Sequence, residues 1–163
     1  KLIDIGEPEE ARFISEELLA RPGLASQAAR HRYGCRVVQH LLQRCPPRMV
    51  HDLVQALLAD CLALSWHPFG TYVVQNLLQH GTDGQRRSVG RTFEGHAAHL
   101  PRSRAGCSVF TVALERLARE DAARLARAAI QQADALEGLP VSRQGSLATL
   151  RVLRVLPGPE AGE

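Results

Sequence analysis

Apolar residues recur along this chain every three to four positions, the spacing of amphipathic helices. In the segment 34–44, a turn of about 100° per residue gathers the apolar side chains between about 200° and 340° on one side. Those side chains are Val37, Val38, Leu41 and Leu42. The segments 9–20 and 48–59 show the same periodicity. The pattern therefore predicts an all-α chain built from short amphipathic helices.

A glycine opens three similar helical segments at a constant interval. Gly34, Gly70 and Gly106 lie 36 residues apart, and a weaker fourth copy opens at Gly145 after a short insertion. The match extends upstream of the glycines, to the equivalent positions His31, His67 and Ser103. Self-similarity at a fixed period of this length is typical of solenoids, in which each repeat buries its apolar face against its neighbours.

The repeat spacing divides the chain into consecutive units, which we expect to form a right-handed α-solenoid of three-helix repeats. We expect the remnant of a preceding repeat at 1–23, repeats at 24–59 and 60–95, a divergent repeat at 96–134, a degenerate or capping repeat at 135–156, and a disordered tail at 157–163. The chain has no initiating Met and begins in the middle of the pattern. We therefore expect it to be part of a longer protein.

Charge and composition indicate which kinds of ligand and partner the chain can bind. The formal net charge is +3 and Lys1 is the only lysine, so arginine carries almost all the positive charge. Arginine suits recognition of nucleic acids because its planar guanidinium both donates hydrogen bonds and stacks on rings. The four cysteines and the pair His96 and His99 lack the spacing of a metal site, so we expect reduced thiols, no metal and no cofactor. No apolar run is long enough to span a membrane.

Two positions in each motif helix point to a binding role. Side chains four residues apart lie one helical turn apart, as Cys35 and Gln39 do in the first copy. Thr71 and Gln75 are the equivalent pair in the second copy. The helix angle places both pairs away from the apolar stripe, so we expect them to be free for binding rather than used in packing.

The segment that runs from Gly70 to Gln75 resembles the Pumilio (PUF) RNA-binding repeat, and the segment from Gly34 to Gln39 is similar to it. The resemblance implies that each repeat reads one base of single-stranded RNA. It assigns base-edge contacts to Cys35, Gln39, Thr71 and Gln75, and base stacking to Arg36 and Tyr72. By the same resemblance, adenine is the base expected at both repeats.

The third and fourth copies depart from this pattern. Ser108 replaces the stacking residue and Thr111 replaces the glutamine, while the fourth copy has Leu150 at the glutamine position. A serine cannot sandwich a base, and a threonine is too short for a bidentate contact. We therefore expect only weaker RNA contacts there, from Cys107, Ser108, Thr111 and Ser146.

The resemblance implies a non-enzymatic regulator of messenger RNA in the cytoplasm, with RNA on the concave face and the convex face left for protein partners. We expect no membrane partner and no small-molecule substrate, since the sequence has no phosphate-binding loop, paired carboxylates or ordered nucleophile. Two alternatives stay open. One is a weakly selective Pumilio-like protein of nucleolar ribosome assembly. The other is a protein-binding armadillo or HEAT solenoid, although those repeats are longer than 36 residues.

Overall fold

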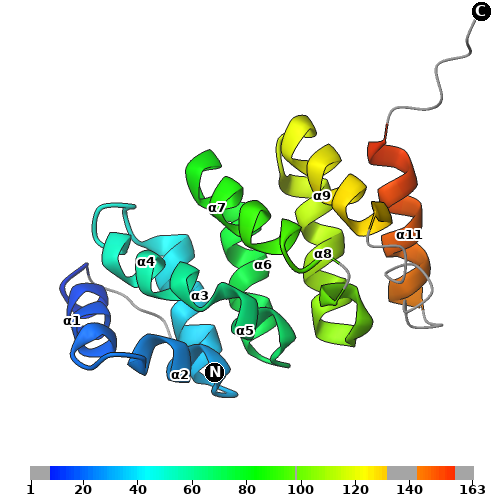
Figure 1. The fold of residues 1–163 in the computed structure, drawn as a ribbon. Coiled ribbons are helices and arrows are strands. Elements are labelled where there is room, and N and C mark those ends of the chain that lie inside the picture. The colour runs from blue at the N-terminus through cyan, green and yellow to red at the C-terminus, as the bar shows by residue number, and fades with distance from the viewer. Residues whose placement is uncertain (1–7, 98, 132–142, 157–163) are drawn as a thin grey trace, which may run out of the picture.

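The described part of the chain is a stack of short α-helices (Figure 1). The computed structural model describes residues 8–97, 99–131 and 143–156, and these residues contain no strand. The helices are α1 (Pro8–Leu19), α2 (Leu24–Arg30), α3 (Gly34–Arg44), α4 (His51–Ala59), α5 (Cys61–Trp66), α6 (Gly70–His80), α7 (Asp83–Glu94), the 3-10 helix η1 (Leu100–Arg102), α8 (Arg104–Arg116), α9 (Arg119–Gln131) and α11 (Arg143–Val155). This architecture confirms the predicted all-α solenoid.

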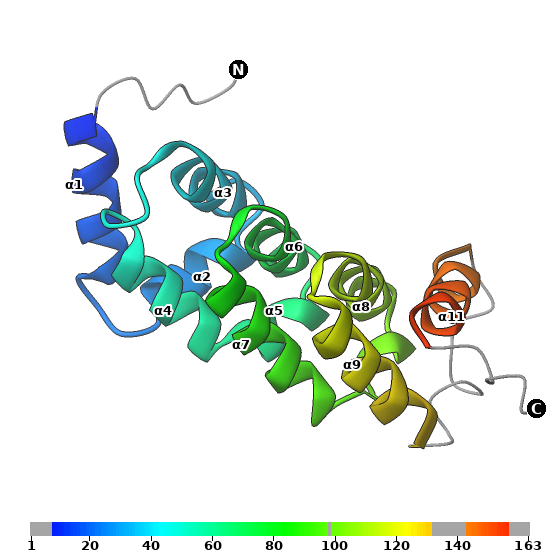
Figure 2. The same cartoon turned by 90° about the horizontal axis from the view of Figure 1, so that it is seen from above.

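The helices form parallel rows (Figure 2). One row contains the glycine-opened helices α3, α6 and α8, followed by α11, and each of these contacts the next. A second row contains α4, α7 and α9, while the short elements α2, α5 and η1 pack against α3, α6 and α8 respectively. Each repeat thus contributes a short helix, a motif helix and an outer helix. We call the exposed side of α3, α6 and α8 the motif-helix face.

Close packing between consecutive helices explains the periodic glycines. A Cβ atom added at Gly70 would lie 2.7 Å from the carbonyl oxygen of Leu64, six residues earlier. The equivalent Cβ atoms at Gly34 and Gly106 would meet the carbonyl oxygens of Ala28 and Leu100 even more closely. None of the three glycines has a positive φ. They are therefore required by the close approach of two backbones and not by an unusual backbone conformation.

The residues three positions before these glycines fix the start of each motif helix. Nδ1 of His67 accepts hydrogen bonds from the backbone N–H groups of Phe69 (3.2 Å) and Gly70 (3.3 Å). His31 makes the equivalent pair of contacts with Tyr33 and Gly34. In the third repeat the hydroxyl of Ser103 accepts from the N–H of Gly106 at 3.0 Å. These side chains satisfy N–H groups that have no partner inside the helix.

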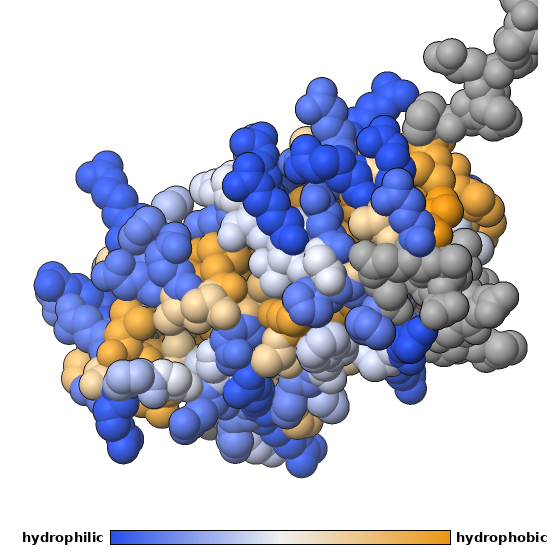
Figure 3. All heavy atoms as spheres, viewed as in Figure 1, coloured by the Kyte–Doolittle hydropathy of each residue, from blue (hydrophilic) through white to orange (hydrophobic). Residues whose placement is uncertain are grey.

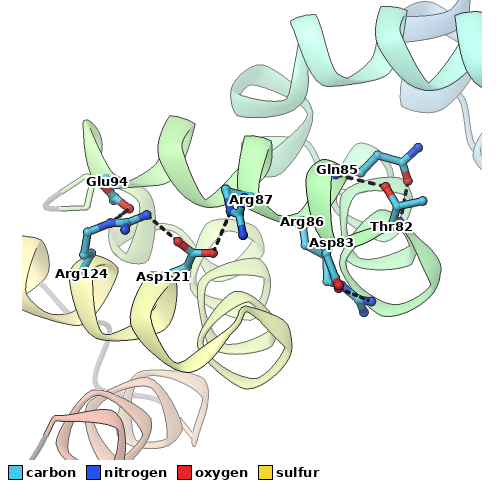
Figure 4. Close-up of polar contacts among 8 residues, drawn as sticks. All are labelled: Thr82, Asp83, Gln85, Arg86, Arg87, Glu94, Asp121 and Arg124. Carbon is cyan, nitrogen blue, oxygen red and sulfur yellow. Dashed lines mark hydrogen bonds and ion pairs between the residues drawn. The ribbon is translucent and has the colours of Figure 1, made fainter.

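Ion pairs join the outer helices of neighbouring repeats (Figure 4). Arg124 on α9 lies 3.2 Å from Glu94 on α7 and 2.5 Å from Asp121 on its own helix. Asp121 is only 6% exposed and also pairs with Arg87 of α7 at 3.5 Å. A buried carboxylate is costly unless it is paired, so this cluster orders the contact between the second and third repeats.

Most predicted helices agree with the structure, and two differences have clear causes. The third motif helix begins at Arg104 and not at Gly106, because Ser103 caps it two residues earlier. The short helix α2 was not predicted as a separate element, since seven residues give too weak a periodic pattern. The expected tail at 157–163, the segment 132–142 and residues 1–7 lie outside the described residues. The boundaries of the repeats stay predictions.

Within the described ranges, no helix combines the length and the apolar character needed to cross a membrane.

Candidate nucleic-acid interface

A hollow on the motif-helix face joins the first two repeats. Its volume is about 420 Å³, and it lies between the N-terminal parts of α3 and α6. Six residues line it: Arg32, Cys35, Arg36, Gln39, Phe69 and Tyr72. Four of the six are residues that the sequence assigned to base recognition. The structure therefore brings predicted contacts from two different repeats into one site.

The two predicted stacking residues lie on neighbouring helices of this site. Tyr72 on α6 is 53% exposed, and Arg36 on α3 is also exposed, so neither side chain is buried in the hydrophobic core. An aromatic ring and a guanidinium plane are the two protein groups that stack best on a base. Because the hollow is lined by both, it can accept a flat ring between repeats.

The predicted glutamines turn back toward their own helices. Nε2 of Gln39 donates to the carbonyl oxygen of Cys35 at 3.0 Å, and Nε2 of Gln75 donates to the hydroxyl of Thr71 at 3.2 Å. Each contact uses one amide N–H. The amide oxygen and the second N–H of both glutamines have no other partner among the described residues, and both side chains are half-buried. Each amide is thus held in place with one donor and one acceptor left for a base edge.

The small residue of each pair is more buried than the helix angle predicted. Cys35 is 2% exposed and Thr71 is 5% exposed, so the expectation that both lie away from packing surfaces is wrong. The cause is the neighbouring repeat, which covers a side of the helix that a single-helix projection treats as open. The hydroxyl of Thr71 donates to the carbonyl oxygen of Ala105 in the next repeat at 3.3 Å. Burial also raises the pKa of the Cys35 thiol.

The third repeat presents little for a base to contact. Cys107 is fully buried, as its equivalent Cys35 nearly is. The hydroxyl of Ser108 donates to the carbonyl oxygen of Arg104 (3.1 Å), and that of Thr111 donates to the carbonyl oxygen of Cys107 (2.9 Å). Both hydroxyl hydrogens are therefore directed at their own helix. The expectation of weaker contacts in this repeat stays a prediction.

In the fourth copy, Ser146 lies in α11, but its side chain is outside the described part of the chain. Leu150, at the glutamine position, is 52% exposed, and Leu153 one turn later is 62% exposed. A hydrophobic area over α11 is visible in Figure 3. The described end of this helix offers apolar surface where the first two repeats offer an amide.

Two residues of the hollow were not predicted from the sequence. Arg32 and Phe69 lie just before the motif glycines, outside the small-x-x-x-Gln pattern of the motif helices. Phe69 is half-buried and packs near His67, with ring centroids 5.9 Å apart. The repeat position of Phe69 gave a usable signal, because the aromatic at 69 recurs as Tyr33 one repeat earlier.

Comparison with known families identifies the repeats. The profile of the Pumilio-family RNA-binding repeat matches residues 27–58 and 60–89. Residues 27–58 and 60–89 are Pumilio-family repeats. The chain is 26% identical over 104 residues to Pumilio homolog 1 of Xenopus laevis, across 64% of this chain and 9% of that protein. It is 31% identical over 71 residues to a Pumilio domain-containing protein of Schizosaccharomyces pombe, across 44% of this chain and 10% of that one.

Solved structures share the fold of this chain at low sequence identity. PUF-8 in complex with PBE-RNA superposes with a TM-score of 0.82 at 18% identity, over 93% of this chain and 45% of that one. The Puf3 RNA-binding domain, bound to a Cox17 RNA 3' UTR recognition sequence, gives a TM-score of 0.75 at 19% identity, over 88% and 40%. This chain therefore spans less than half of each of these two solved domains and about a tenth of the two curated relatives.

Proposed function

We propose that this Pumilio-family chain binds single-stranded RNA on its motif-helix face and reads at least one base at the junction of α3 and α6. The single observation that carries the proposal is the shared hollow. It places a guanidinium (Arg36), an aromatic ring (Tyr72) and an oriented amide (Gln39) around one space. The two solved relatives are bound to RNA, which supports the same ligand for this chain.

Different side chains of the site would stack on the base and recognise its edge. A base enters between Arg36 and Tyr72, which hold its two faces, while Gln39 meets its edge with one donor and one acceptor. Cys35 forms part of the wall beside that edge. Stacking contributes about 1–3 kcal/mol per base with little dependence on base identity, so selectivity comes from the amide and the shape of the wall.

The junction between α6 and α8 differs from the junction between α3 and α6. The hydrogen bond from Thr71 to Ala105 joins the two repeats directly, and Ser108 offers no ring or guanidinium to complete a stack. A base bound by Gln75 is therefore stacked by Tyr72 on one face only. We propose that affinity for a base falls from the first repeat to the second, and that selectivity falls in the third, where Thr111 replaces the glutamine.

We infer a role in post-transcriptional control of messenger RNA in the cytoplasm, without catalysis. The alternative within the family is a protein that binds RNA with little sequence selectivity, as in nucleolar ribosome assembly. The replacement of a stacking side chain and of a glutamine in the third repeat, at Ser108 and Thr111, favours that alternative for part of the face. The match of residues 27–58 and 60–89 to the Pumilio-family RNA-binding repeat supports RNA binding over the armadillo or HEAT interpretation.

Selection from a random pool of single-stranded RNA, at moderate salt, tests the proposal. We expect enrichment of a short motif that contains adenine, and loss of the enriched base preference in Gln39→Ala. Binding without enrichment would favour the weakly selective alternative, and it would be marked by a steep dependence on salt. Absence of binding by the folded chain would contradict RNA recognition by this segment.

A further inference from the structure

Arg32 stands at the edge of the base-sized hollow but belongs to no base-reading pattern. Its side chain is exposed and lines the hollow with Arg36, and no Asp or Glu is among the lining residues. The guanidinium carbon of Arg32 lies 5.4 Å from the ring centroid of Tyr33, within the range of a cation–π contact. Tyr33 in turn contacts the ring of His31, with centroids 6.0 Å apart. The rings of Tyr33 and His31 therefore help to position the Arg32 guanidinium.

Three arginines on the outer helices α7 and α9 are in a different situation. Arg86, Arg87 and Arg124 all pair with carboxylates, as Figure 4 shows. Arg32 and Arg36 have no carboxylate partner among the described residues. Both arginines that line the hollow therefore keep their positive charge uncompensated by a carboxylate. Two arginines without carboxylate partners beside a stacking site favour a ligand that carries both a flat ring and a negative charge.

We propose that Arg32 binds a backbone phosphate of the RNA strand whose base lies between Arg36 and Tyr72. The inference rests on the proposed function and adds a contact that is independent of base identity. A guanidinium can donate two parallel hydrogen bonds to one phosphate. Arg36 is already required for stacking, so Arg32 is the cation left to meet the charge of the same nucleotide.

The test is the salt dependence of binding for the full chain, with a single-stranded RNA oligonucleotide taken from the selection. Removing one phosphate contact with a single strand reduces the steepness of the plot of log K against log [salt] by about 0.7. We expect Arg32→Gln to reduce the steepness by about this amount and to weaken binding to all sequences alike. Arg32→Lys keeps the charge and should keep the slope.

Arg91→Gln is the matched control, because Arg91 is also exposed and has no ion pair within the described residues, but it lies on α7 and does not line the hollow. Both variants remove one positive charge. Equal slopes for Arg32→Gln and Arg91→Gln would overturn the phosphate contact while leaving the proposed function intact. A change of base preference in Arg32→Gln would overturn it as well. Failure of the unmodified chain to bind any RNA would instead refute the proposed function itself, and the phosphate contact with it.

Discussion

The hydroxyl of Thr71 donates a hydrogen bond across a repeat boundary to the backbone carbonyl of Ala105, at 3.3 Å. The same hydroxyl accepts from the amide of Gln75 at 3.2 Å. One small side chain therefore both ties two repeats together and orients the residue that we assign to base recognition. The Oγ1 atom of Thr71 thus contributes both to the stability of the repeat contact and to the orientation of Gln75. Substitutions at Thr71 and at Gln75 can separate these two effects.

Thr71→Val should lower the free energy of unfolding by about 1 kcal/mol, because it removes the hydrogen bond between the two repeats. Gln75→Ala removes only a half-buried amide and should change stability little while weakening RNA binding. Urea denaturation followed by circular dichroism measures the first effect, and an RNA titration measures the second. Unchanged stability in Thr71→Val would show that the inter-repeat hydrogen bond contributes nothing.

Gly70→Ala should destabilise the chain by about 1–3 kcal/mol, because the added Cβ lies against backbone atoms that cannot move aside. The control is Gly84→Ala in α7, where the nearest atom to an added Cβ is the Thr82 hydroxyl at 3.9 Å. That substitution should be neutral or stabilising by up to about 1 kcal/mol, since alanine favours helix. Similar effects of the two variants in thermal denaturation would contradict the packing explanation of the periodic glycines.

His67→Ala should cost about 0.5–2 kcal/mol by removing the acceptor for the first N–H groups of α6. His67→Ser should recover part of this stability, because serine accepts the equivalent hydrogen bond at position 103 of the third repeat. Chemical denaturation of the two variants is sufficient to compare them. Equal destabilisation by Ala and Ser would show that the histidine acts through its ring packing and not through its acceptor.

The buried thiols predict a pH dependence of stability. Desolvation raises the pKa of Cys61, and the neighbouring Thr92 side chain opposes the rise only in part. The folded state then holds the thiol proton more tightly than the unfolded state does. This contribution is complete below the ordinary thiol pKa and is lost as the pH rises through the raised value. Urea titrations should therefore show a steeper loss of stability above about pH 9 in the unmodified chain than in Cys61→Ala. Parallel pH profiles would contradict the shift.

The fold could be predicted well from the sequence because its signals are local. The bounds of α3 agree with the predicted segment 34–44, and α6 begins at its predicted glycine, since each helix has a glycine that allows a close approach at one end and a regular apolar stripe. Periodicity could not show why the glycines recur. That reason is a contact with the carbonyl group six residues earlier, which depends on how consecutive helices pack.

The candidate site was predicted only in part because it is formed between repeats. The exposure of Tyr72 and Arg36 follows from their angle on one helix and agrees with the structure. The burial of Cys35 and Thr71 depends on the neighbouring repeat, which a single-helix projection does not include. Arg32 and Phe69 reach the hollow from the turns that precede α3 and α6. The recurrence of an aromatic at 33 and 69 marks the position of Phe69, but the approach of both residues to the hollow depends on how the repeats pack.

The most direct test of the base-binding hollow is a double-mutant cycle between protein and RNA. The affinity of the unmodified chain and of Tyr72→Ala is measured for a selected oligonucleotide and for the same oligonucleotide with one abasic position at the adenine. We predict that removal of the base costs the unmodified chain about 1–3 kcal/mol and costs Tyr72→Ala much less, because the stacking partner is already absent. Equal losses of affinity in both proteins, at every position of the oligonucleotide, would show that no base lies against Tyr72 and would contradict the proposed site.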